Sequence, residues 1–158
     1  MSFQYTPLFL TVLLCGSVLA MSCLERKESD VAQKIIAMEK AALDRWGRGD
    51  PWGYTEISSE EVTYFDTGTE KRMDGLNTLK KYYKTLEGKI DIDHYEMIDP
   101  KVQIHENTAI LTFNLIDYEP NNNGSFSETY WSSTEVYSRI DGEWKIVHTH
   151  WSKPKSEQ

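Results

Sequence analysis

The stretch that decides the fold lies near the end of the chain, at residues 130–152, and reads YWSSTEVYSRIDGEWKIVHTHWS. Two runs rich in β-branched and aromatic residues flank Asp141-Gly142, a pair typical of a two-residue hairpin turn of the primed type. The stretch therefore predicts two antiparallel strands, at residues 126–140 and 143–151, that form the last hairpin of a sheet.

A two-residue turn also predicts which residues face one another across this hairpin. In a regular hairpin the residue numbers of every facing pair add up to the same total. Ile140 therefore faces Glu143, and Glu135 faces His148. On this register one side of the hairpin carries Glu135, His148, Trp131, Tyr137, Ile146 and His150.

Glu135 beside His148 is the arrangement of a general base and its orienting group, with Cβ atoms roughly 5 Å apart. The same pair can equally be a cross-strand ion pair that fixes register, and we favour this simpler interpretation. His150 points the same way as His148, but zinc needs three or four ligands and only Glu135 adds to the pair. We expect no metal site, and we expect no cofactor because the sequence has neither a phosphate-binding loop nor a dinucleotide turn.

The first half of the chain has helical patterns. An apolar stripe at helical spacing predicts a helix from Asp30 to about Gly47, and capping signals predict helices at residues 50–57 and 74–88. Strand patterns occupy residues 62–65, 92–98, 102–105 and 109–118, with Pro100 indicating a bulge or an edge position. Helices followed by a meander predict an α+β fold, with the helices on one face of the sheet.

Length and charge limit the classes of function. A chain of 158 residues with 39% hydrophobic content fits one domain, which we place at residues 30–152, followed by a flexible tail at 153–158. The net charge of -8 repels phosphate backbones, so we do not expect a nucleic-acid partner.

The N-terminal residues 1–22 contain no charged side chain and include an apolar run at residues 8–20, which is typical of a signal peptide. Cleavage after Ala20 and a lipobox that makes Cys23 the first, acylated residue are both compatible with this segment. We therefore expect an exported protein, either periplasmic or lipid-anchored, or alternatively secreted, with a short linker at residues 23–29. Membrane contact would come only through the lipid anchor.

The pattern Asp-Gly-x-Trp-x-x-Val-His-x-His-x-Ser at residues 141–152, with residues 50–84 and 99–115, resembles the association domain of calcium/calmodulin-dependent protein kinase II. It is also similar to the bacterial SnoaL-like (polyketide cyclase-like) domains of the nuclear transport factor 2-like superfamily. The resemblance implies a cystatin-like cone, in which three N-terminal helices pack on a strongly curved antiparallel sheet around a conical pocket. It also implies dimerisation through the outer face of the sheet.

In the kinase hub this pocket carries arginines that attract small carboxylates. The resemblance places Lys80, Asn114 and Glu135 at those positions, and only Lys80 keeps the positive charge. The pocket expected from the hairpin and the resemblance together is lined by Trp46, Tyr54, Lys80, Asn114, Trp131, Tyr137, Ile146 and His150.

Two classes of function follow. The first is a dimeric binding or assembly module, without a kinase domain, that holds a small apolar or aromatic ligand. The second is an isomerase, cyclase or dehydratase that uses Glu135 with His148 to move a proton beside a carbonyl. We favour the binding module, because no group of residues in the sequence demands catalysis.

Overall fold

The computed structural model describes residues 9–154, with side chains from residue 26 onward. Three helices precede most of the strands, so the predicted α+β class is confirmed. In chain order the elements are α1 (Phe9–Trp46), α2 (Trp52–Ile57), β1 (Ser58–Phe65), β2 (Met73–Asp74), α3 (Leu76–Lys84), β3 (His94–His105), β4 (Thr108–Pro120), β5 (Phe126–Ile140) and β6 (Glu143–Ser152).

The six strands form one mixed sheet in the order β2-β1-β6-β5-β4-β3. Strands β3 to β6 form an antiparallel meander, but β1 runs parallel to β6. The prediction of a wholly antiparallel sheet is therefore wrong. Hairpin signals identify strands that are neighbours in sequence, whereas β1 joins β6 across most of the chain.

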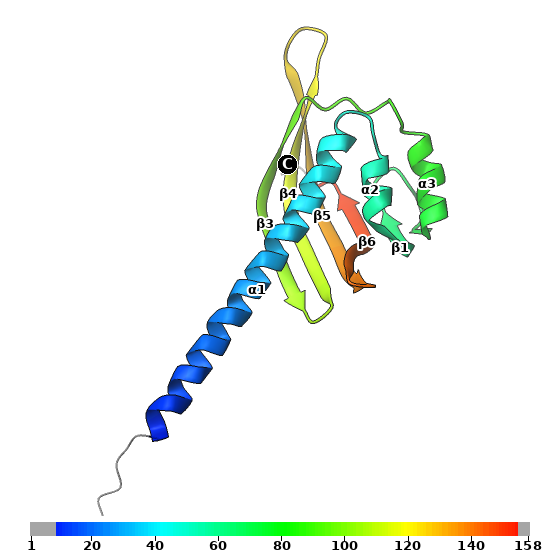
Figure 1. Cartoon of the computed structure of the whole chain (residues 1–158). Coiled ribbons are helices and arrows are strands. Elements are labelled where there is room, and N and C mark those ends of the chain that lie inside the picture. The colour runs from blue at the N-terminus through cyan, green and yellow to red at the C-terminus, as the bar shows by residue number, and fades with distance from the viewer. Residues whose placement is uncertain (1–8, 155–158) are drawn as a thin grey trace, which may run out of the picture.

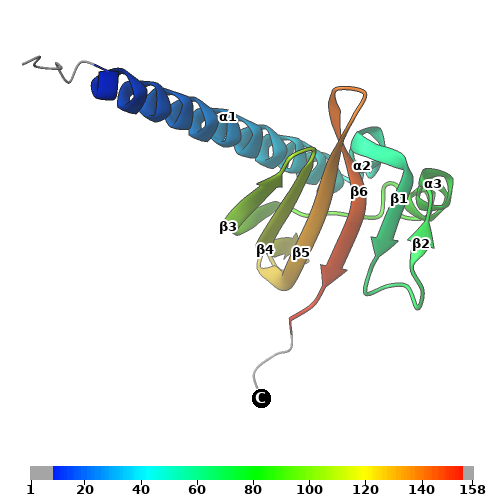
Figure 2. The same ribbon diagram turned by 90° about the horizontal axis from the view of Figure 1, so that it is seen from below.

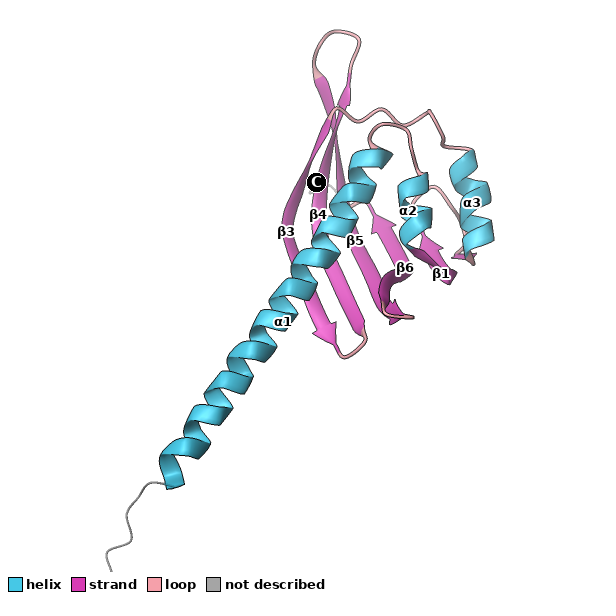
Figure 3. Cartoon of the chain, viewed as in Figure 1, coloured by secondary structure: helices cyan, strands magenta, loops and turns pink. Residues whose placement is uncertain are grey.

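All three helices lie on one face of the sheet, as Figures 1 and 3 show, and the view in Figure 2 leaves the other face uncovered. Inward-facing residues alternate along β4, where Leu111 and Leu115 are almost fully buried against the helix layer. Together with Ile35 of α1, Leu79 of α3 and Ile146 of β6 they form the centre of the core.

Helix α1 begins earlier than expected. Asp30, the predicted N-cap, lies inside the helix, and residues 23–29 are helical instead of forming a linker. Nothing in residues 23–30 breaks a helix, because this segment has no Gly or Pro. The early turns of α1 project beyond the sheet in Figure 1. Residues 1–8 of the expected signal peptide and 155–158 of the expected tail lie outside the described residues.

Among the described helices, none combines the length and the hydropathy that a membrane span requires.

The turn chemistry matches the predictions. Asp141 and Gly142 have φ angles of 51° and 86°, so the hairpin has the expected turn of the primed type. The β3–β4 register shifts between Ile98 and Lys101, which confirms an irregularity at Pro100 on this edge strand. Strand β2, only two residues long, is too short for a sequence pattern to reveal.

The register of the last hairpin departs from the prediction midway. Ile140 faces Glu143 as expected, but a bulge between Tyr137 and Val136 places an extra residue, Val147, on β6. From there Glu135 faces Thr149, and His148 faces Val136. The predicted Glu135–His148 pair is therefore wrong.

The bulge also decides which side chains of β6 enter the core. Trp144 and Ile146 are buried before it, and Thr149 is buried after it. Without an extra residue, strict alternation from Ile146 would turn His148 inward instead of Thr149. The bulge thus places the hydroxyl of Thr149 in the core, where a regular strand would place the imidazole of His148.

Candidate ligand-binding site

A cavity of about 160 Å³ lies between the helix layer and the sheet. Its wall is mainly aromatic, with two carboxylates and no Lys, Arg or His among the lining side chains. The lining residues are Leu43, Trp46, Tyr54, Tyr64, Asp66, Tyr82, Tyr83, Leu86, Ile90, Leu115, Asp117, Trp131 and Trp151.

Edge-to-face contacts hold the aromatic wall in place. The Trp46 ring lies 5.8 Å from Tyr54 and 5.3 Å from Tyr83, between ring centroids, at steep interplanar angles. Across the cavity, Trp131 and Trp151 meet at 6.1 Å and 88°. Such pairs contribute beyond their buried area, so the wall is shaped before any ligand enters.

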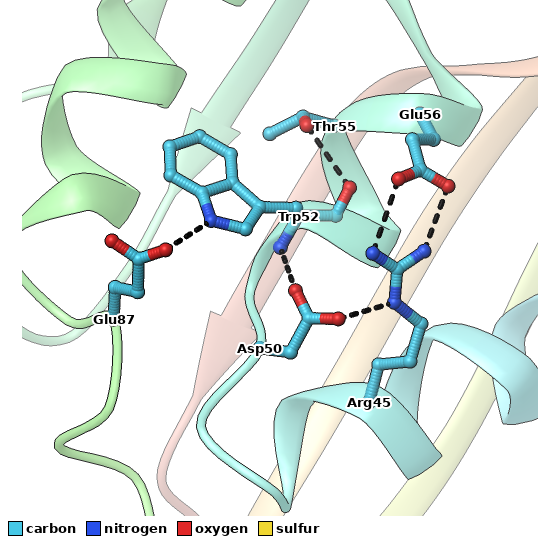
Figure 4. A network of polar contacts seen from close by, with 6 residues as sticks. All are labelled: Arg45, Asp50, Trp52, Thr55, Glu56 and Glu87. Atoms are coloured by element: carbon cyan, nitrogen blue, oxygen red, sulfur yellow. Dashed lines mark hydrogen bonds and ion pairs between the residues drawn. The ribbon is translucent and has the colours of Figure 1, made fainter.

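A polar network around Arg45 fixes the helix ends that carry this wall (Figure 4). The Arg45 guanidinium donates to Asp50 at 2.7 Å and to both carboxylate oxygens of Glu56 at 2.7 and 3.1 Å. Asp50 also accepts the backbone N–H of Trp52, whose indole donates to Glu87 at 2.7 Å. The network therefore ties the end of α1 to α2 and to the turn after α3.

Asp117 brings a nearly buried carboxylate to the cavity. It continues the inward alternation of β4 and is only 7% exposed. Burial raises its pKa to about 6. The neighbouring Trp131 indole lowers this pKa by less than burial raises it, and its Nε1 lies outside hydrogen-bonding geometry with every described residue.

Asp66, the second carboxylate of the lining, is half-buried at the start of the loop after β1. It accepts the Tyr82 hydroxyl at 2.7 Å. Burial, and then this hydrogen bond, raise the pKa of Tyr82, so the phenol stays protonated and the carboxylate keeps its donor.

Two more carboxyls, Glu39 of α1 and Glu135 of β5, are fully buried behind the cavity. Glu39 accepts the hydroxyls of Tyr54 and Tyr137 at 2.8 and 2.7 Å. Burial raises its pKa to about 7 despite these bonds. Tyr54 both lines the cavity and contacts Glu39, so the buried carboxyl supports the wall.

Glu135 has its own set of donors. The Thr149 hydroxyl donates to it at 2.5 Å and the Ser133 hydroxyl at 3.2 Å. Burial, reinforced by the nearby Glu39, raises the pKa of Glu135 well above its ordinary value. Glu135 does not line the cavity, so it acts on the site only through the packing around it.

The sequence of the domain matches a known family. The family profile of the calcium/calmodulin-dependent protein kinase II association domain matches residues 31–155. The chain belongs to this family. The family predicted from residues 141–152 is therefore confirmed.

Solved structures with a similar fold accompany the family match. A candidate ketosteroid isomerase from Parabacteroides distasonis is 42% identical, with a TM-score of 0.68 over 77% of this chain and 86% of that chain. The association domain of C. elegans CaMKII is 22% identical, with a TM-score of 0.69 over 80% and 98%. A nuclear transport factor 2-like protein of Pseudomonas putida is 16% identical, with a TM-score of 0.70 over 81% and 89%. No curated protein matches the chain.

The structure of this association-domain protein divides the predicted site residues into three groups. Trp46, Tyr54 and Trp131 line the cavity. Tyr137 and Ile146, like Glu135, are buried in the core behind it. The remaining predicted residues that the structure describes, Lys80, Asn114, His148 and His150, lie away from the cavity.

Each residue of the last group has a local reason for its position. Helix α3 turns Leu79 and Tyr83 inward, so Lys80 is exposed on its outer side. Asn114 is exposed between the inward-facing residues of β4. The bulge places His148 on the same outer face, where its Nδ1 lies 2.8 Å from the Thr63 hydroxyl, and leaves His150 exposed.

Among the described side chains, no cluster of His, Cys, Asp or Glu has the arrangement of a metal site. Cys23 lies in the part of α1 whose side chains are not described, so its acylation stays a prediction.

Sequence reasoning missed three acidic residues of the site and its surroundings. Asp117 had a signal, because it extends the apolar alternation of β4 from Leu111 to Leu115 with a carboxyl. Glu39 also had one, since it lies between Ile35 and Ala42 on the apolar stripe of α1. Asp66 lies in a loop, where no periodic pattern marks a residue as facing inward.

Proposed function

We propose that this association-domain protein is a binding module whose cavity holds a small apolar or aromatic ligand. The observation that carries the proposal is the aromatic cavity itself, which is held open by edge-to-face contacts and backed by the Glu39 network. The conical pocket expected from the family is, on this proposal, this cavity.

Its volume limits the ligand. A dry cavity of about 150 Å³ takes benzene, whereas drug-sized ligands occupy pockets of about 300–1,000 Å³. At about 160 Å³ the cavity suits a ligand with one ring, and a four-ring steroid would not fit.

The test is native mass spectrometry of the purified protein, followed by titration of whatever compound it releases. Leu86→Trp fills the cavity from its half-buried lining position and should abolish binding. His150→Ala, on the uncovered face, is the matched control and should bind as the natural protein does. Full affinity in the Leu86→Trp protein would show that the cavity is not the binding site.

We also propose that the module self-associates through the uncovered face of its sheet. Two neighbours in the family are named as an association domain and a hub. Half-buried apolar side chains, among them Ile110, Ile116 and Val136, lie on this face between inward-facing neighbours. Burying them in a dimer would remove apolar surface from water.

Sedimentation at micromolar concentration tests this self-association. Ile116→Arg should convert dimer to monomer, because it places an uncompensated charge in the proposed interface. Lys80→Glu, on the exposed side of α3, should leave the dimer unchanged. A natural protein that sediments as a monomer would contradict the proposal.

The same proposal includes export, through a signal peptide at residues 1–22 with either cleavage or acylation of Cys23. Fractionation of cells with Cys23→Ser separates the two routes. Loss of membrane association in the variant supports the lipid anchor, and an unchanged soluble exported form supports simple cleavage. Retention of the uncleaved chain in the cytoplasm would contradict export.

A second function, proton transfer beside a carbonyl, is favoured by Asp117 and not by Glu135. Asp117 lines the cavity with a pKa of about 6, which is close to the value that suits a general base. Deuterium incorporation into cyclohexanone at the carbon beside the carbonyl, followed by NMR, tests this function. Exchange above background that Asp117→Asn abolishes would support an enzyme, and exchange at the background rate would exclude this reaction.

A further inference from the structure

The geometry points to a small organic cation, an amine or quaternary ammonium on one ring, as the ligand of the aromatic cavity. This inference rests on the proposed binding function and names the chemical class of its ligand.

The charge of the lining favours a cation. The lining carries the carboxylates of Asp66 and Asp117 and no basic side chain. A cavity with this composition attracts a positive ligand and repels a carboxylate, because opposite charges interact strongly where water is excluded. It is the reverse of an arginine-lined pocket that captures anions.

Asp117 lacks a well-placed donor in the cavity. This carboxylate is 7% exposed, and the one described donor that lowers its pKa, the Trp131 indole, lies outside hydrogen-bonding geometry. A buried carboxylate is costly unless it is paired. An ammonium N–H of a ligand in the cavity would supply that pairing, and no neutral apolar ligand would.

The aromatic wall also favours a cation. Cations bind over the faces of Trp and Tyr rings, and seven such rings line this cavity. One of them already receives an ammonium, since Lys153 places its Nζ 4.9 Å from the ring centroid of Trp131. Lys153 is exposed and outside the lining, so it leaves the interior of the cavity negative.

Three probes of one size test the inference: benzylamine, benzyl alcohol and benzoate, titrated by calorimetry at pH 7.5. These share a single ring and differ in charge. We expect benzylamine, bound as its cation, to bind about tenfold or more tightly than benzyl alcohol, and benzoate to bind weakest.

Variants show which residue produces the preference for the amine. Asp117→Asn should reduce the preference for the amine over the alcohol to less than about threefold, while the alcohol binds as before. Glu61→Gln, an exposed acidic position on β1, should keep the full preference. If Asp117→Asn does not fold by circular dichroism, Asp66→Asn replaces it and should give a smaller change in the same direction.

The outcomes separate the two proposals. If no probe binds, the binding function fails. If benzyl alcohol binds as tightly as benzylamine, or benzoate binds best, the cavity stands as a binding site and the cationic ligand is wrong. An amine preference that persists in both Asp variants would also overturn the inference.

Discussion

Thr149 Oγ1 donates a hydrogen bond to Glu135 Oε2 over 2.5 Å, in the place where a regular hairpin would put His148. The bulge at Val147 produces this exchange. It removes the acid–base pair that would have suggested catalysis and leaves Glu135 as a structural carboxyl. The stability of the domain should therefore depend on this hydrogen bond.

Thr149→Val tests that dependence. The variant keeps the shape of the side chain but leaves one oxygen of a buried carboxyl without its donor, so the free energy of unfolding should fall by about 1–3 kcal/mol. Chemical denaturation measures it. Thr149→Ser keeps the hydroxyl, so its free energy of unfolding should fall less. Equal losses in both variants would show that the hydrogen bond does not account for the loss in Thr149→Val.

Glu39 predicts a pH dependence of stability. The folded state holds this proton up to about pH 7, whereas the ordinary pKa is 4.5. The folded state therefore binds more protons than the unfolded chain between these values, so stability is full below about pH 4.5 and falls as pH rises through 7. The loss is on the order of 3 kcal/mol, and the raised pKa of Glu135 adds to it in the same direction.

Glu39→Gln should reduce the slope of this profile, because a neutral amide has no proton to lose and can still bond to Tyr54 and Tyr137. The slope that remains is the contribution of Glu135. Denaturation at pH 5 and pH 8 makes the comparison. The exposed position Glu61→Gln serves as control and should keep the natural slope. A slope that does not change in Glu39→Gln would assign the effect to another group.

Asp117 should titrate near pH 6 and be visible in tryptophan fluorescence, because Trp131 and Trp151 line the same cavity. A carboxylate that gains charge beside these rings changes their emission. The natural protein should show a midpoint at about pH 6, and Asp117→Asn should remove it. An unchanged transition in the variant would point to a different titrating group.

The Arg45 network predicts that replacing Arg45 lowers the melting temperature more than replacing Arg72. Arg45→Lys loses the fork that bonds to Asp50 and Glu56 together, so the melting temperature should fall by about 2–4 °C. Arg72→Lys changes an exposed pair with Asp74 and should have almost no effect. Melting curves at low and high salt check both, since salt should narrow the gap between the variants. Equal melting of the two variants at low salt would contradict a role for the network.

Much of the fold could be read from local patterns. The apolar stripe that ends at Trp46, the Asp141-Gly142 turn and the irregularity at Pro100 each depend on neighbouring residues, and each was predicted. The parallel pairing of β1 with β6 was not predicted, because it joins segments more than 80 residues apart in the sequence.

The candidate site was predicted only in part, for a related reason. Trp46, Tyr54 and Trp131 were expected as wall residues from the hairpin and the family resemblance, and they line the cavity. The acidic residues Asp66 and Asp117 were not predicted to line the cavity, since Asp and Glu side chains usually lie on the surface. Only their position beside the aromatic rings gives them a role.

The sequence by itself determined the family, the α+β class and the turn that begins the last hairpin, because periodicity and turn chemistry are local properties of the chain. The tertiary structure decided the rest of the site. One extra residue at Val147 reversed the faces of β6, and burial turned Glu39, Asp117 and Glu135 into carboxyls with raised pKa values. Register beyond a bulge and desolvation both depend on what packs around a residue, which no local pattern records.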